Sequence, residues 1–154
     1  MKKLLLGIAG LLIALAGGYQ ATNMIGAGVY TGERTVMNEV ATTTVGTEFL
    51  TNDYRQVIFT VANTAASGTH KFACSDQEDV DFATAAGPTN RWDYISVTDL
   101  EDGSGFDGDT GWVTTNNSEV RRFEVEINGA YYCTGMWTRT SGTSSVFMRP
   151  YDNQ

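Results

Sequence analysis

An alternation of residue types across residues 119–127 constrains the fold of this chain more than any other sequence feature. Phe123, Val125 and Ile127 stand on one side of the alternation, and charged residues stand between them. A period of two places one face of a strand in the core and the other in water. Arg121 also falls on the apolar side. Beyond residues 1–18 no segment has the 3.6-residue period of a helix, so the chain is predicted to be all-β.

Further segments rich in Thr, Val and aromatic residues are also predicted to be strands. They are residues 55–62, 69–74, 91–100, 111–115, 131–138 and 144–149. Turns are expected at residues 63–68 and 139–143, the second with Gly142 as its left-handed residue. Asn128-Gly129 is a strong hairpin signal, because both residues tolerate positive φ. The last three strands should therefore form a meander, and the whole domain an antiparallel β-sandwich of jelly-roll type.

The N-terminal residues follow the order of a secretory signal peptide. Lys2 and Lys3 precede an apolar run at residues 4–15, and Ala14-Leu15-Ala16 supplies a cleavage site after Ala16. An uncleaved membrane anchor is the alternative, in which the run spans the bilayer at a tilt. Three regions are predicted: a hydrophobic helix at 1–18 (signal peptide or anchor), a linker or N-terminal arm at 19–38, and the β-sandwich domain at 39–154. The domain is expected to be secreted or displayed at an extracellular surface, with a membrane-anchored form as the alternative.

The formal net charge of −8 excludes some classes of partner. Once Lys2 and Lys3 leave with the leader, the exported part stands near −10, and Lys71 is its only lysine. A nucleic-acid surface needs clustered Lys and Arg, so no nucleic-acid partner is expected. Acidity of this kind also disfavours anionic lipid, so membrane contact is expected only through an uncleaved N-terminal segment.

Cys74 and Cys133 are the only two cysteines of the chain. In an oxidising compartment they would form one disulfide, which would stabilise the fold by about 4 kcal/mol through the unfolded state. The alternative is a pair of buried free thiols that pack as small hydrophobic groups. Both alternatives stand at this stage, because bridging depends on the distance between the two Cα atoms.

The sequence carries no catalytic signature, and we predict no catalytic residue. His70 is the only histidine, which excludes the two-histidine zinc patterns. On a strand His70 would share a face with Phe72 and Cys74. A Cys–His dyad needs an exposed thiol, which a bridged or buried Cys74 does not offer. The sequence also contains no Gly-x-Ser-x-Gly elbow, phosphate loop or dinucleotide fingerprint, so an enzyme is not expected.

An acidic, glycine-rich segment at residues 99–111 is a candidate calcium site. Its candidate ligands are Asp102, Asp107 and Asp109. Calcium takes six to eight oxygen ligands, and glycines allow backbone carbonyls to turn inward. No glutamate follows at the spacing of an EF-hand. The alternative is a solvated loop whose Asp and Gly residues serve turn geometry.

Aromatic side chains form the other candidate site. Trp92, Tyr94, Trp112 and Trp137 would bind carbohydrate if several lay flat on one exposed sheet face. The alternative is that most of them fill the interior, since Trp and Tyr are largely buried on average. Trp92 and Tyr94 share one face of their strand, opposite Ile95 and Val97.

Several strand and turn patterns carry a family resemblance. Residues 53–62, 71–75 and 92–95 give the strand patterns, and residues 123–129 and 140–143 give the closing turns. Together they resemble small β-sandwich proteins found on phage particles and in prophage regions, over residues 40–150. The resemblance implies a non-enzymatic virion-surface or decoration-type protein that packs against a capsid or tail and has no cofactor. The leader departs from that pattern, because virion proteins assembled in the cytoplasm normally carry no export signal.

Two functions follow from these observations. The first is a structural or interaction protein, exported or on a virion surface, that acts by assembly or adhesion with a protein partner or with itself. The second is a secreted carbohydrate-binding module that uses surface Trp and Tyr side chains, with calcium in the acidic loop.

Overall fold

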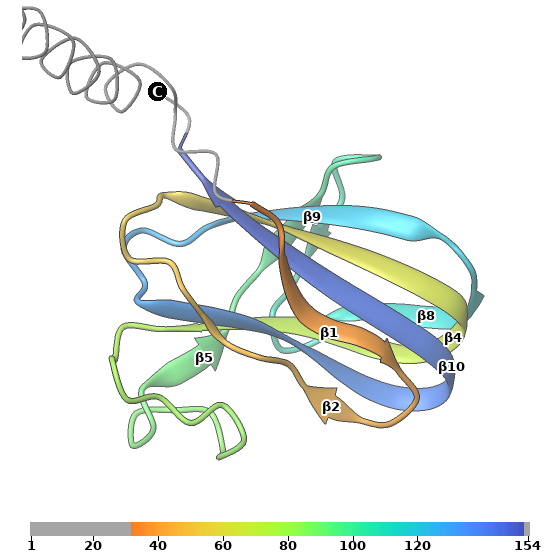
Figure 1. The fold of residues 1–154 in the computed structure, drawn as a ribbon, viewed down its shortest axis with the longest axis horizontal. Helices are drawn as coiled ribbons and strands as arrows, with labels where there is room; N and C mark the ends of the chain where they lie inside the picture. The colour runs from red at the N-terminus through yellow and green to blue at the C-terminus, as the bar shows by residue number, and fades with distance from the viewer. Residues whose placement is uncertain (1–31, 153–154) are drawn as a thin grey trace, which may run out of the picture. The chain divides into compact units, whose positions relative to one another are not determined.

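Two twenty-residue strands, β4 (Gln56–Ser75) and β10 (Tyr132–Tyr151), pair antiparallel from end to end and form the spine of the domain (Figure 1). The computed structural model describes residues 32–152, so the predicted helix at 1–18 lies outside the described residues. Residues 32–152 contain ten strands and no helix, and accordingly no helix there could cross a membrane. The prediction of an all-β antiparallel fold is confirmed.

Eight shorter strands flank the spine. They are β1 (Arg34–Val40), β2 (Thr44–Val45), β3 (Phe49–Leu50), β5 (Trp92–Tyr94), β6 (Val97–Asp99), β7 (Gly105–Phe106), β8 (Trp112–Asn117) and β9 (Val120–Glu126). β1 begins at Arg34, within the predicted N-terminal arm at residues 19–38.

Each spine strand changes its outer neighbour halfway along. The first half of β4 pairs with β9, and the second half pairs with β8 and β5. β10 pairs first with β3 and β2 and then with β1. The sheet therefore has two halves that share the spine. We call them the β9 half (β1, β9, β6 and β7 with the adjoining spine) and the β8 half (β2, β3, β5 and β8 with the adjoining spine).

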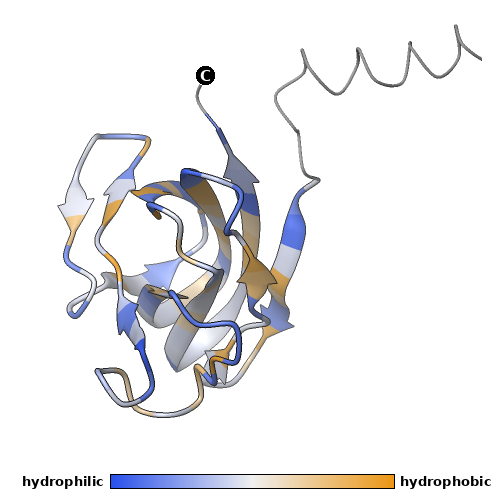
Figure 2. Ribbon diagram, turned by 90° about the vertical axis from the view of Figure 1, so that its left-hand side faces the viewer, coloured by the Kyte–Doolittle hydropathy of each residue, from blue (hydrophilic) through white to orange (hydrophobic). Residues whose placement is uncertain are grey.

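Irregular backbone at the middle of both spine strands folds the sheet over. β10 shifts register between Arg139 and Thr143, opposite Gly68 to Thr64 of β4. Ala65 has a φ of 46° and Gly142 a φ of 74°. A Cβ at Gly142 would collide with the carbonyl group of Ala65, so the two strands need glycine here to approach. Bulges bend a strand and increase its twist, and Figure 2 shows the strands curving around the interior.

The core lies between the two halves. Phe59 of the β9 half stacks on Phe72 of the β8 half, with ring centroids 4.4 Å apart. Phe72 and Trp112 both contact Phe123 of β9. The largest fully buried apolar side chains come from both halves: Trp137, Phe59, Phe123, Met148, Val57, Val61 and Val146.

A second apolar cluster covers the outer face of the β8 half. Ala73 of β4 and Met136 of β10 pack there with Trp92 and with Phe82, which the loop between β4 and β5 supplies. Both faces of this half are covered, because Ala73 packs in this outer cluster and its neighbour Cys74 packs in the main core. Alternation alone could not show that a loop covers the outer face. The single strand predicted at residues 91–100 is wrong: β5 lies in this half, and β6 pairs with β9 in the other half.

The predicted closing meander is wrong, although its turn chemistry is correct. Asn128 and Gly129 have φ values of 44° and 87°, and Ala130 N donates to Ile127 O at 2.9 Å. The strands on either side do not pair with each other: Glu126 lies opposite Gln56, and Tyr132 lies opposite Ser75. These partners are the two ends of β4, so the turn carries the chain from one half to the other.

The turns predicted at residues 63–68 and 139–143 are also wrong. Both segments lie inside the spine strands, where they form the bend. Gly142 is left-handed as predicted, but it serves a bulge and not a reversal of the chain.

Cys74 and Cys133 form a disulfide, so the bridged alternative is confirmed. They face each other across the spine with Cα atoms 4.2 Å apart, and 59 positions separate them in the sequence.

A loop of this length predicts that the Cys74→Ala/Cys133→Ala double variant loses about 4 kcal/mol of unfolding free energy. Urea denaturation of the two proteins measures the difference. A loss below about 1 kcal/mol would mean that the spine holds its ends together without the bridge.

Candidate functional site

The four aromatic residues considered for carbohydrate binding are not gathered on an exposed face. Trp92, Trp112 and Trp137 have exposed fractions of 3%, 7% and 0%. Trp92 and half-buried Tyr94 belong to the outer cluster, whereas Trp112 and Trp137 belong to the main core. A sugar ring could reach these tryptophans only if the packing around them opened.

Trp112 and Trp137 instead enclose His70 in an inward-facing ladder. His70 lies opposite Trp137 of β10 on one side and opposite Trp112 of β8 on the other. The imidazole centroid is 5.7 Å from the Trp137 ring, almost parallel to it, and 5.4 Å from the Trp112 ring. Cross-strand aromatic pairs of this kind stabilise a sheet. The ladder therefore joins three neighbouring strands of the β8 half.

His70 is buried without a polar partner. Its exposed fraction is 0%, and neither ring nitrogen has a hydrogen-bond partner among residues 32–152. Burial lowers the pKa of His70 from 6.5 to about 3, because the charged imidazolium would lose its hydration. His70, Phe72 and Cys74 share the inward face as predicted, and the Cys74 sulfur is held in the disulfide.

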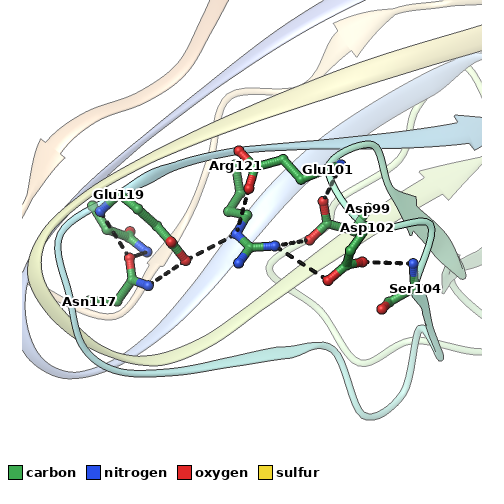
Figure 3. A network of polar contacts seen from close by, with 8 residues as sticks. Asp99, Glu101, Asp102, Ser104, Asn117, Glu119 and Arg121 are labelled. Carbon is green, nitrogen blue, oxygen red and sulfur yellow. Dashed lines mark hydrogen bonds and ion pairs between the residues drawn. The ribbon is translucent and has the colours of Figure 1, made fainter.

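The acidic loop is organised around a single guanidinium group (Figure 3). Arg121 Nη1 lies 2.7 Å from Asp99 Oδ2 and 3.7 Å from Asp102 Oδ2. Its Nε lies 3.1 Å from Glu119 Oε1 and 3.4 Å from Glu101 Oε2. The Asp99 side chain is only 1% exposed, so its charge is compensated inside the protein. Arg121 thus lies on the same side of β9 as Phe123 and Val125, as the alternation of residue types along the strand suggests. The four carboxylates explain how a positive charge is tolerated on that side.

Hydrogen bonds shift the pKa values of two members of this network, Asp102 and Arg121. Ser104 donates to Asp102 and, with Arg121 nearby, holds the pKa of that carboxyl group below its usual value. The hydrogen bond to Asp99, followed by that to Glu119, raises the pKa of Arg121 further. Asp102 and Arg121 therefore both carry their charge at neutral pH.

Two of the three candidate calcium ligands, Asp102 and Asp107, accept hydrogen bonds within separate turns. Asp102 Oδ1 accepts from Ser104 N, while Asp107 Oδ1 accepts from Asp109 N and Thr110 N. Within residues 32–152 no group of three or more His, Cys, Asp or Glu side chains is placed to hold a metal ion. The contacts of Asp102 and Asp107 therefore stabilise turns, and Asp102 also belongs to the Arg121 network.

The surface also carries an open depression of about 490 Å³ beside the disulfide. Asp76, Arg91, Trp92 and Ile127 are among its lining residues, and Arg91 forms an exposed 2.7 Å ion pair with Asp76. An exposed pair of this kind contributes little stability. Ser75, the one hydroxyl side chain among its lining residues, donates to Arg91 O at 2.6 Å.

No protein-family model and no curated protein sequence matches this chain. Among solved structures, the chain is similar to the SPBc2 prophage-derived protein YomS, with a TM-score of 0.57 and 16% identity. The match covers 78% of this chain and 91% of that protein, so the two share a fold. A particle of Israeli acute paralysis virus gives a TM-score of 0.28 and 12% identity over 92% of this chain and 81% of the viral chain, which is too low to carry an argument.

The burial of His70 predicts a loss of stability in acid. Because its pKa is about 3 in the folded chain and about 6.5 in the unfolded chain, only the unfolded state takes up a proton between these values. The unfolding free energy should fall by about 1.4 kcal/mol per pH unit from about pH 6.5 downward. The accumulated loss should be about 4 kcal/mol near pH 3. His70→Phe keeps a ring in the ladder and removes this dependence, which urea denaturation across pH 7 to 4 measures. Parallel curves for the two proteins would refute the assignment.

Breaking the Arg121 network should be costly. Arg121→Met leaves the buried Asp99 carboxylate without its cation and should lower the unfolding free energy by about 3 kcal/mol. Arg122→Met is the matched control, since Arg122 is the next residue of β9 and is exposed. The control should change stability by less than about 0.5 kcal/mol. Equal effects of the two substitutions in chemical denaturation would contradict the role given to Asp99.

Proposed function

We propose that this chain is a non-enzymatic structural protein of phage or prophage type, which acts by contact with a protein partner or with further copies of itself. The observation that carries the proposal is the fold shared with a prophage-derived protein over 91% of that protein's length. The sandwich formed by the two facing halves, of the jelly-roll type expected from the sequence, belongs to the same proposal.

The placement of the polar residues supports this function. The single histidine is enclosed between two tryptophans, both cysteines are bridged, and the acidic loop is tied to Arg121. Each of these groups stabilises the domain. The surface is then left to provide contacts, which is what an assembly or adhesion protein requires.

The disulfide supports an extracellular or virion-surface location. Disulfides persist in oxidising compartments, and the predicted leader would deliver the chain to one. In this proposal residues 1–18 are either removed on export or retained as an anchor.

The carbohydrate-binding alternative loses its main support, because all three tryptophans are buried. Carbohydrate recognition would then depend on other side chains.

Light scattering coupled to size-exclusion chromatography tests the proposal on protein exported from the full-length gene. The expected result is a defined oligomer at micromolar concentration. A monomer at every concentration, together with saturable polysaccharide binding, would contradict it.

A further inference from the structure

The free edge of β8 differs from every other edge of the sheet. Within residues 32–152, β8 pairs only with β4, so the opposite edge of its backbone has no strand beside it (Figure 1). The strand is six residues long, and Val113 and Thr115 point outward, with Val113 exposed to 63%. An exposed edge of this length is a template for pairing with another strand.

The other edge strands carry the features by which proteins prevent such pairing. β2, β3 and β7 have two residues each, and β5 has three with Asp93 at its centre. β1 has Arg34 and Glu39 and two register shifts against β10. Short strands, charges and bulges all discourage pairing at an edge. β8 carries no charged residue, and its one register shift against β4, between Thr114 and Asn117, lies in its second half together with the left-handed Asn116.

The charge distribution indicates which partner fits this edge. Residues 32–152 contain all eighteen acidic residues of the chain and eight basic ones, a net charge of −10. Two copies therefore repel each other over most of their surface. Residues 111–118 contain no charged side chain, so a second copy can approach there without a carboxylate facing a carboxylate. A basic partner, in contrast, would be attracted to the acidic surface and not to this edge.

We propose that β8 is the self-association site of this protein: β8 of one copy pairs antiparallel with β8 of a second copy. The pairing is isologous, so each copy offers the same surface about a two-fold axis. It joins the two β8 halves into one continuous sheet by strand addition. The outward row of Val113 and Thr115 then continues across the axis. This inference deepens the proposed function by naming the surface through which assembly begins.

Val113→Lys tests the site. It places a cation on the exposed edge, where two copies would bring like charges together, and should raise the dimer dissociation constant at least about tenfold. The substitution makes the chain less acidic, so weaker association cannot come from greater overall repulsion. The control is Val45→Lys on β2, the same substitution at a valine that is 43% exposed on the opposite edge of the same half. Sedimentation equilibrium on protein exported from the full-length gene measures both variants, and thermal melting checks that they are folded.

Hydrogen exchange supplies a second readout. Amides of residues 112–117 in the unsubstituted protein should exchange more slowly at high than at low protein concentration, and Val113→Lys should remove that difference. An oligomer that survives Val113→Lys unchanged would overturn the inference and leave the proposed function standing. Loss of association in both variants would indicate head-to-tail pairing of β8 with β2, which also overturns it. A protein that stays monomeric, with unprotected β8 amides, overturns it as well.

Discussion

The pairing of β4 with β10 is the constraint on which the rest of the structure depends. It runs from Tyr132 opposite Ser75 to Tyr151 opposite Gln56, and it is bent at its middle by bulges in both strands. Both halves of the sheet contain part of this one bent pair. The bend therefore brings their inward faces together, and no loop is needed to join two separate sheets. The disulfide closes one end of the pair, and the His70 ladder crosses it between the disulfide and the bend.

Local patterns predicted the strands well and their partners poorly. The alternation at residues 119–127 became β9, and Asn128-Gly129 adopted the turn geometry that its residue types favour. Residues 63–68 and 139–143 have the Gly, Ser and Asn content of turns, but the same residues also suit bulges inside a strand. Long-range pairing decides between a turn and a bulge, and a short window of sequence does not contain it.

For the candidate sites, too, the sequence predicted local features well and long-range contacts poorly. Alternation placed His70, Phe72 and Cys74 on one face, and the structure buries all three. It could not show that the outer face beside Trp92 is covered by a loop bearing Phe82. Arg121 was the missed signal: an arginine on the apolar side of a strand requires a carboxylate partner, and the nearby acidic loop supplies it. Read together, these two features would have predicted an ion-pair network in place of a calcium site.

Native-state hydrogen exchange tests the central role of the bent pair most directly. If β4 and β10 hold both halves as one unit, the amides of Val61 in the β9 half and Phe72 in the β8 half should exchange with one free energy, equal to that of global unfolding. Both amides should also respond equally to added denaturant. If the β8 half opened at a clearly lower free energy than the β9 half, the spine would not couple them, and this account of the fold would be contradicted.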